Sequence, residues 1–299
     1  MTDVVCLGDI LIDMFPNEVG RRLAETSAFH PKPGGSQANV AVALARLGVR
    51  TAFIGKVGED AFGQQLVEVM RREGVDVRGM RFDAEARTTM AFIAMPDVNT
   101  PEFVFYRNPG ADTRLRPDEL DRALLQTTRA FQFGGLNLTA EPTRGATVEA
   151  LHLARASGAL ISFDANYRPA LWPSMAAARE QILAVLPHVH VLKANEVELE
   201  VITGTREVEK ASEVILSTGI ELCVVTLGGK GSFFRVAGAT GATDFVPTPA
   251  VETVDATGCG DAFVAGLLSP GWWSAPSGGI SSHPRACGSV CAMRMPSAR

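Results

Sequence analysis

The sequence contains few cysteines, and none of them form a recognisable pair. Five occur in 299 residues, and no two show the CxxC spacing of a redox or zinc motif. They are Cys6, Cys223, Cys259, Cys287 and Cys291. An odd number spread along the chain argues against a disulfide framework, and the reducing cytoplasm is the expected location.

Long apolar runs and an excess of positive charge are also absent. No stretch approaches the roughly 20 apolar residues that span a bilayer. The N-terminus, MTDVVCLGD, leads into strand-like residues without a basic segment before them. The formal net charge is −5, so the chain has no broad positive field to hold nucleic acid or an anionic membrane. We expect neither as a partner.

Short apolar runs alternate with segments of helical period, and 46% of the residues are apolar. The runs expected to be strands are Val4–Leu7, Thr51–Ile54, Ala130–Phe133, Leu160–Phe163, Val189–Leu192 and Leu222–Leu227. We expect helices over Ser36–Leu47 and from Asp60 to Gly74. This alternation predicts an α/β fold with a mostly parallel sheet covered by helices on both faces.

Two segments interrupt the alternation, residues 10–33 and residues 88–107. In the second, TTMAFIAM and EFVFYR flank the turn-rich PDVNTP, which predicts a hairpin. No linker rich in glycine and serine separates these segments from the rest. We therefore expect one α/β domain over residues 1–268 with a small β appendage.

The segment VDATGCGDAFVAGLL, residues 254–268, places a glycine loop directly before an apolar helix. Gly258 and Gly260 let the backbone approach a ligand, and the N–H groups of the first helical turn suit an anion such as a phosphoryl group. Asp261 would be ionised at neutral pH and could accept a proton from an alcohol. An ordinary capped turn produces the same short pattern, so this fragment alone leaves both interpretations open.

A second glycine pair lies in PGGSQANVAVALARLG, residues 33–48. Gln37 and Asn39 follow it near the start of the predicted helix and could bind sugar hydroxyls. A helix-capping turn explains the same residues equally well.

These two segments, together with further stretches in the same order, resemble the signature regions of the PfkB (ribokinase-like) carbohydrate kinases. The further stretches are GDILID (8–13), FIGKVGEDAFG (53–63), YRNPGAD (106–112), DANYR (164–168), NEVE (195–198) and TLGGKGS (226–232). The resemblance runs from Val4 to about Leu268. YRNPGAD, DANYRPALWP and LAETSAFHPKPGG are similar to the fructokinase branch.

The resemblance implies a doubly wound α/β fold with a small β-sheet lid, and a kinase that uses ATP and Mg2+. The expected reaction is phosphorylation of a primary hydroxyl of a ketose, with fructose giving fructose 6-phosphate. Kinases for ribose, 2-keto-3-deoxygluconate or a nucleoside are alternatives, as is a catalytically impaired regulatory homologue. An NAD-dependent oxidoreductase is disfavoured because no GxGxxG follows the first strand, and GxxxxGK[ST] of P-loop kinases is absent.

The resemblance also implies roles at the acceptor side of the site. Asp261 matches the catalytic base, and the backbone of Gly258, Cys259 and Gly260 matches the anion hole for the γ-phosphate. Cys259 replaces an alanine that is frequent there, and we expect no thiol chemistry because only the backbone N–H is needed. The residues matched to sugar binding or to the transferring phosphate are Asp13, Gly34, Gly35, Asn39, Arg107 and Arg168.

At the donor side, the resemblance implies nucleotide contacts from Asn195, Thr226, Gly228 and Gly231. Glu198 matches a residue that organises magnesium through water, although Asn195 and Glu198 would also cap a helix. Asp255 and Thr257 match positions that hold a monovalent cation such as K+ in some relatives. The turn TLGGKGS also reads as a hairpin between LCVVT and SFFRV.

Residues 269–299 depart from the family pattern. Ser269, Pro270 and Gly271 end a helix that relatives continue, and the following residues have no helical period. We interpret this segment as an atypical tail produced by a frameshift or an annotation error. The edges of the β appendage make a homodimer the expected assembly.

Overall fold

The computed structural model describes residues 2–94, 96, 102–238, 243–248 and 257–269. Asp255 and all of the tail except Ser269 lie outside these ranges, and so do most residues of PDVNTP. In the part of the chain that is described, no helix is long and apolar enough to cross a membrane.

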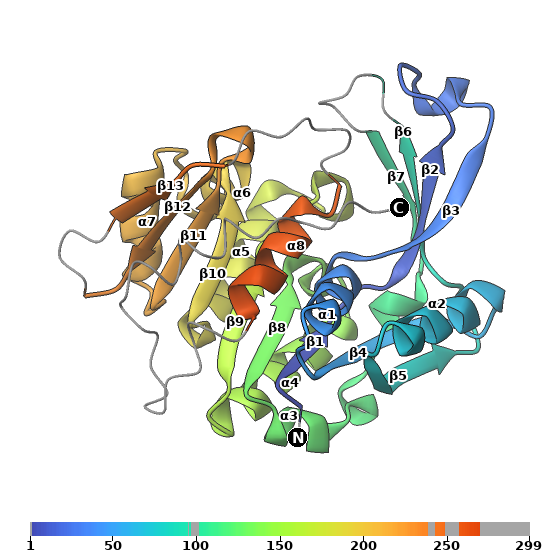
Figure 1. The fold of residues 1–299 in the computed structure, drawn as a ribbon, viewed down its shortest axis with the longest axis horizontal. Coiled ribbons are helices and arrows are strands. Elements are labelled where there is room, and N and C mark those ends of the chain that lie inside the picture. The colour runs from blue at the N-terminus through green and yellow to red at the C-terminus, as the bar shows by residue number, and fades with distance from the viewer. Residues whose placement is uncertain (1, 95, 97–101, 239–242, 249–256, 270–299) are drawn as a thin grey trace.

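The main sheet has the strand order β13-β12-β11-β10-β9-β8-β1-β4-β5 (Figure 1). Its strands are β1 (Val4–Leu7), β4 (Thr51–Gly58), β5 (Asp76–Asp83), β8 (Ala130–Gly134), β9 (Leu160–Asp164), β10 (Val191–Asn195), β11 (Leu222–Thr226), β12 (Ser232–Val236) and β13 (Thr243–Val246). All neighbours from β5 to β11 pair in parallel, and β12 and β13 add an antiparallel edge. The mostly parallel sheet is as expected.

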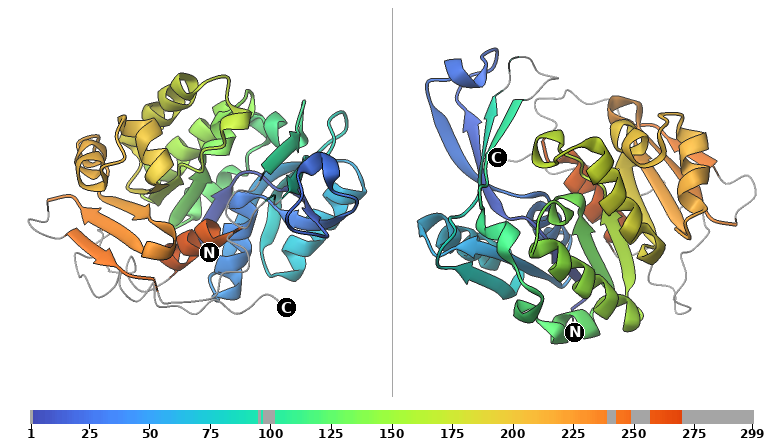
Figure 2. Two further views of the ribbon diagram at one scale, coloured as in Figure 1. Left: turned by 90° about the horizontal axis from the view of Figure 1, so that it is seen from above. Right: turned by 180° about the vertical axis from the view of Figure 1, so that it is seen from behind.

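Helices cover both faces of this sheet (Figures 1 and 2). One face carries α1 (Ser36–Arg46), α2 (Ala61–Arg72) and α8 (Cys259–Leu268), and the other carries α3 (Arg122–Thr127), α4 (Thr143–Ala156), α5 (Met175–Val185), α6 (Glu196–Thr203) and α7 (Val208–Leu216). Val4 and Cys6 pack toward the first layer, while Val5 and Leu7 pack toward the second. This period-two alternation explains why β1 is apolar throughout: both of its faces are buried.

The predicted helix boundaries follow from local chemistry. The Asp60 carboxylate accepts the N–H of Gly63 (2.8 Å) and so caps α2. Gly48 and Gly74, just beyond α1 and α2, both have φ of 82°. Several strand boundaries differ from the expected ones, and the largest extension is β4, which continues four residues beyond Ile54 to Gly58. β10 begins two residues later than expected, because Leu186–His188 form a 3-10 turn in which the carbonyl of Leu186 accepts the N–H of Val189 (3.0 Å).

The two interrupting segments form a second sheet with the order β3-β2-β6-β7. Its strands are β2 (Leu11–Pro16), β3 (Phe29–Gly34), β6 (Met90–Ala94) and β7 (Glu102–Tyr106). The expected antiparallel pairing of β6 with β7 is present. A parallel pairing of β2 with β6 joins the two segments, and Figure 1 shows this sheet standing beside the main one.

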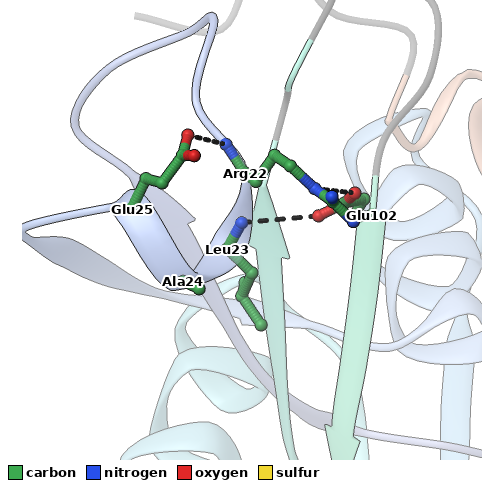
Figure 3. A pocket seen from close by; sticks show the side chains of 5 residues that line it. All are labelled: Arg22, Leu23, Ala24, Glu25 and Glu102. Carbon is green, nitrogen blue, oxygen red and sulfur yellow. Dashed lines mark hydrogen bonds and ion pairs between the residues drawn. The ribbon is translucent and has the colours of Figure 1, made fainter.

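A shallow pocket lies on this small sheet, where the 3-10 turn η1 (Leu23–Glu25) meets β7 (Figure 3). Glu102 holds the turn by accepting from Arg22 Nε (3.2 Å) and from the N–H of Leu23 (3.4 Å). The Arg22 side chain is 72% exposed, so its ion pair adds little stability. The pocket is an open surface feature, and we assign no chemistry to it.

Candidate active site

The candidate site lies where several strands of the main sheet end. Asp164, Asn195 and Thr226 are the last residues of the neighbouring strands β9, β10 and β11, and Asn195 pairs directly with Thr226. Ligands of open α/β sheets bind outside the carboxyl ends of the strands. The first turn of α8 comes to the same place, because Gly260 lies against the side chain of Lys193 on β10.

Asp261 lies in the first turn of α8, after Gly258 has turned the chain with φ of 78°. Its Oδ1 accepts a hydrogen bond from Ser36 Oγ (2.8 Å), and its Oδ2 accepts one from Asn39 Nδ2 (2.8 Å). Both donors come from α1, which packs against α8 (Figure 1). The carboxylate is thus fixed beside a helix N-terminus, whose N–H groups and dipole attract negative charge.

Burial raises the pKa of Asp261 to about 7. The hydrogen bonds from Asn39 and Ser36 lower it, while the charges of Asp164 and Asp9 raise it further. A base whose pKa lies near the working pH combines a useful ionised fraction with strong proton affinity. The environment of Asp261 therefore suits proton abstraction from an alcohol.

Asp13, on β2, is a second carboxylate with a raised pKa. Burial, followed by the charges of Asp9 and Asp261, raises its pKa to about 7, and Arg168 opposes the shift. A Cβ at Gly34 would overlap Asp13 Oδ2, so only glycine lets this carboxylate lie against the backbone. Gly35 has φ of 102°, and a Cβ there would come within 2.5 Å of the carbonyl of Asp9. The predicted pair of glycines thus makes room for the Asp13 side chain and for the backbone at Asp9.

Ser36 and Asp9 are site residues that our sequence reasoning missed. Asp9 is 3% exposed, and its Oδ2 accepts the N–H of Ser36 (2.7 Å), which fixes the start of α1. Its Oδ1 is buried without a hydrogen-bond partner among the described residues, and burial raises its pKa. The available signals were weak: Asp9 is the first acid of GDILID, and Ser36 follows the glycine pair.

Two amide residues of α1 have different roles. Asn39 reaches Asp261, as described above. Gln37, for which the sequence left sugar binding and a capping turn open, is fully buried, and its Oε1 accepts from Gln132 Nε2 (3.1 Å). The interpretation of Gln37 as a sugar ligand is wrong, because its side chain joins α1 to β8 inside the core.

The two predicted arginines differ in how firmly they are held. Arg107 is buried and ion-paired with Asp112 (2.7 Å), and it also donates to Thr139 Oγ1 (2.9 Å). Arg168 is half-buried and donates to the carbonyl of Tyr167 (3.2 Å). The charge of Arg168 lowers the pKa of Asp13, so the guanidinium acts on this carboxylate.

Asn195 and Glu198 form a capping box at the start of α6. Asn195 Oδ1 accepts the N–H of Val197 and of Glu198 (2.9 Å each), and Glu198 Oε2 accepts the N–H of Asn195 (2.8 Å). Glu198 Oε1 accepts the N–H of Tyr167 (3.0 Å). The structure therefore shows the helix-capping role of this pair. The capping bonds of the Asn195 side chain use Oδ1, so a nucleotide contact would come from Nδ2.

Direct ligation of magnesium does not fit Glu198, which is 2% exposed and has both oxygens engaged by backbone N–H groups. Over the described ranges, no three or more His, Cys, Asp or Glu residues gather in a way that could hold a metal. Mg2+ prefers oxygen ligands, keeps several waters and is commonly held by substrate phosphates. The site therefore suits a magnesium ion that is bound mainly by the phosphates of the nucleotide.

The remaining predicted positions surround the end of β11. The β11–β12 hairpin is confirmed, with Thr226 pairing Ser232. Gly228 and Gly231 have φ of 58° and 120°, and a Cβ at Gly231 would overlap the carbonyl of Val246. Thr257 and Cys259 are exposed beside the start of α8. No nucleotide or cation contact of these residues is tested by the geometry, and their roles stay predictions.

Comparisons with known proteins agree with this architecture. The model of the pfkB family carbohydrate kinases matches residues 1–270. Fructokinase-1 of Zea mays is 44% identical over 268 residues, which cover 89% of this chain and 81% of the maize protein.

Two solved structures show the same fold. Fructokinase of Xylella fastidiosa with bound ATP has a TM-score of 0.78 and 32% identity, and the match covers 89% of this chain and 80% of that one. Fructokinase of Vibrio cholerae O395, in the fructose, ADP and calcium ion bound form, has a TM-score of 0.82 and 28% identity, with 97% and 89% covered. The ribokinase-like fold is confirmed, and the chain belongs to the pfkB family of carbohydrate kinases.

Proposed function

We propose that this carbohydrate kinase transfers the γ-phosphoryl group of ATP to a primary hydroxyl of fructose, giving fructose 6-phosphate and ADP. The observation that carries the proposal is the carboxylate of Asp261, fixed by Ser36 and Asn39 at the N-terminus of α8. Support for fructose comes from the maize relative and from the two fructokinase structures.

In the proposed reaction, Asp261 accepts the proton of the attacking hydroxyl. The sugar oxygen forms a bond to the γ-phosphorus while the bond from that phosphorus to the oxygen of the leaving ADP breaks. The N–H groups of the loop from Gly258 and of the first turn of α8 stabilise the negative charge spread over the phosphoryl oxygens. Asp13 accepts hydrogen bonds from other sugar hydroxyls and so orients the acceptor.

The other groups in the proposal surround this centre. Arg168 contacts the sugar or the transferring phosphate, and Asn195 with Thr226 borders the nucleotide. Magnesium accompanies ATP and supplies charge neutralisation on its phosphates, with Glu198 reaching it only through water. The sheet of β2, β3, β6 and β7 acts as a lid that excludes water from the bound sugar.

Several finer expectations stay predictions. They are a monovalent cation near Asp255 and Thr257, a homodimer, a cytoplasmic location and the interpretation of residues 269–299 as a frameshifted tail. Comparing turnover in potassium and in sodium salts would test the cation. Resequencing the coding region would test the tail. If the DNA sequence is confirmed and no other reading frame encodes a helix there, the frameshift interpretation is wrong.

The proposal is tested by ADP release from Mg-ATP with fructose, ribose or 2-keto-3-deoxygluconate. We expect the highest kcat/KM with fructose, and we expect Asp261→Asn to lower kcat by about 10²–10⁴-fold, the range of general-base catalysis. Asp118→Asn, an exposed acid in a surface ion pair with Arg116, is the matched control and should retain activity.

The alternatives predict different outcomes. A higher kcat/KM with ribose or 2-keto-3-deoxygluconate would replace fructose as the proposed substrate and would leave the kinase mechanism unchanged. Folded wild-type protein that releases no ADP with any of the three sugars contradicts the catalytic proposal and favours a regulatory homologue. Full activity of Asp261→Asn contradicts the role of this carboxylate as the base.

A further inference from the structure

Lys193 is an unusual residue for its position. It lies on the central strand β10, in the apolar sequence VLKAN, and is only 6% exposed. Its ammonium pairs with both carboxylate oxygens of Asp164 on the neighbouring strand β9, at 3.0 and 3.2 Å. Because burial of two charges costs desolvation free energy, an apolar pair of similar volume would stabilise such a core at least as well. The pair therefore calls for an explanation beyond stability.

The ammonium lies directly against the loop that begins α8. A Cβ placed on Gly260 would be 3.2 Å from Lys193 Nζ and 3.9 Å from its Cε. Gly260 is the residue before Asp261, and it belongs to the turn that we expect to bind the transferring phosphoryl group. Lys193 thus places a buried positive charge beneath the anion-binding turn, on the side away from solvent.

The surroundings keep this lysine charged. Burial by itself would lower the pKa of Lys193, but the charges of Asp164, Glu198 and Asp261 outweigh burial and raise it. The interaction is reciprocal, since a cation stabilised by the Asp261 carboxylate also stabilises that carboxylate. Asp164 acts in the opposite direction on Asp261, because its negative charge raises the pKa of the base.

We propose that Lys193, held by Asp164, is a positioning residue for phosphoryl transfer: its buried ammonium supports the turn at Gly260 and adds positive potential behind Asp261 and the incoming phosphoryl group. A fixed charge in a site of low dielectric constant acts strongly on the charge that develops in the transition state. This inference deepens the proposed function and rests on it.

The charged groups around Asp261 come from several elements, while α1 contributes the neutral donors Ser36 and Asn39. The charged groups are Asp9 after β1, Asp13 on β2, Asp164 at the end of β9 and Lys193 on β10. Further out, Glu198 acts on Lys193, Arg168 on Asp13 and Arg107 on Asp9. Lys193 is the cation on which Asp261 itself acts, so its removal should leave the acids around Asp261 less compensated. Removal of Asp164 should instead relieve one like charge.

The test compares Lys193→Met, Lys193→Arg and Asp164→Asn in the full chain. We expect Lys193→Met to lower kcat by about 10–100-fold with the KM for fructose changed little, because the lost interaction acts mainly in the transition state. The pH midpoint of the acidic limb of kcat/KM should rise in Lys193→Met and fall in Asp164→Asn, each by roughly 0.5–1 unit. Lys193→Arg, which keeps the charge, should restore the midpoint.

A second readout does not depend on turnover. Carboxyl carbon NMR, with the Asp261 resonance assigned by its loss in Asp261→Asn, measures the pKa of this group in each folded variant. We expect the pKa of Asp261 to rise in Lys193→Met and to fall in Asp164→Asn. If Lys193→Met does not fold, Lys193→Gln, which removes the charge and keeps a polar side chain, carries the same test against Lys193→Arg.

The outcomes separate this inference from the proposed function. Wild-type protein without sugar kinase activity sinks the proposed function, and the NMR titration still decides whether Lys193 controls Asp261. An active wild type whose pH midpoint and Asp261 pKa are the same in Lys193→Met and Asp164→Asn overturns the inference alone. Equal shifts in the same direction overturn it too, since they indicate a general structural disturbance.

Discussion

At the scale of single residues, the chemistry of the site depends on how three acids share a small space. Asp9, Asp13 and Asp261 each have a pKa raised first by burial and then by the charges of neighbouring acids. Two hydrogen bonds from α1 oppose this effect at Asp261. The pKa of Asp261 therefore lies near neutral pH, where a carboxylate in water would be fully ionised.

The first prediction concerns the dependence of rate on pH. Because Asp261 must be deprotonated to act as a base and its pKa is about 7, kcat/KM for the sugar should fall as the pH decreases below about 7. Below the midpoint, loss of one proton-accepting group lowers the rate about tenfold per pH unit. Steady-state rates in constant ionic strength buffers measure this. A flat profile between about pH 5.5 and 8 contradicts the assignment.

The second prediction concerns the two donors to Asp261. Both hydrogen bonds favour the charged carboxylate and lower its pKa, so Ser36→Ala and Asn39→Ala should each move the acidic limb to higher pH and slow the reaction at pH 7. The matched control is Ser174→Ala, which removes a hydroxyl that caps the distant helix α5 through the N–H of Ala177. The control should leave the midpoint unchanged. A Ser36→Ala profile that overlays wild type would refute this account.

At the scale of secondary-structure elements, two helix N-termini meet to build the site. α1 supplies Ser36 and Asn39, and α8 supplies the turn that carries Asp261. Gly35 begins α1 in a left-handed conformation that L residues rarely adopt, with the carbonyl of Asp9 directly behind it. The start of α1 is thus packed against Asp9, the acid that precedes β2.

The third prediction separates backbone strain from close packing at the two ends of α1. Gly48→Ala meets no atom within 4 Å and should cost only the left-handed backbone penalty, about 1–2 kcal/mol. Gly35→Ala adds an overlap with the carbonyl of Asp9 and should cost more, at least about 2–3 kcal/mol. Denaturant unfolding of both variants measures the difference. Equal losses would show that the space behind Gly35 is unimportant.

At the scale of the whole molecule, the active site opposes stability. An acid whose pKa is higher in the folded state binds its proton more tightly when folded. Between pH 3.8 and about 7 the folded protein therefore carries more protons at Asp261 than the unfolded chain does. Its contribution to the free energy of unfolding then decreases as the pH rises through this window, and Asp13 acts in the same direction.

The fourth prediction follows from that sign. Asp261→Asn removes a charge that burial disfavours, so it should raise the free energy of unfolding at pH 8, by up to about 4 kcal/mol, while the gain shrinks toward pH 4. Urea unfolding at both pH values measures the gain. Asp118→Asn, at an exposed ion pair, should show none. A gain of equal size at both pH values would contradict the titration argument.

Much of the architecture could be predicted from sequence because it rests on local patterns. The apolar run of β1 lies between parallel partners, and the caps at Asp60 and Gly74 bound α2 as expected. The glycine loop before α8 and Asp261 could be recognised for the same reason, since both belong to one continuous segment. Family membership followed from several such segments in order.

The groups that surround Asp261 could not be found without the three-dimensional fold. The two donors to Asp261 are 225 and 222 residues away along the chain, and no local pattern relates Ser36 or Asn39 to it. Lys193 drew no attention in the sequence, because only the fold places it against Gly260. Sequence patterns were sufficient for the strand-helix alternation, for α1 and α2 and for the glycine turn before Asp261, because these depend on short-range periodicity and backbone freedom. Charge, burial and pKa in the site depend on contacts across the chain, and those arise only when α1, α8 and β10 pack together.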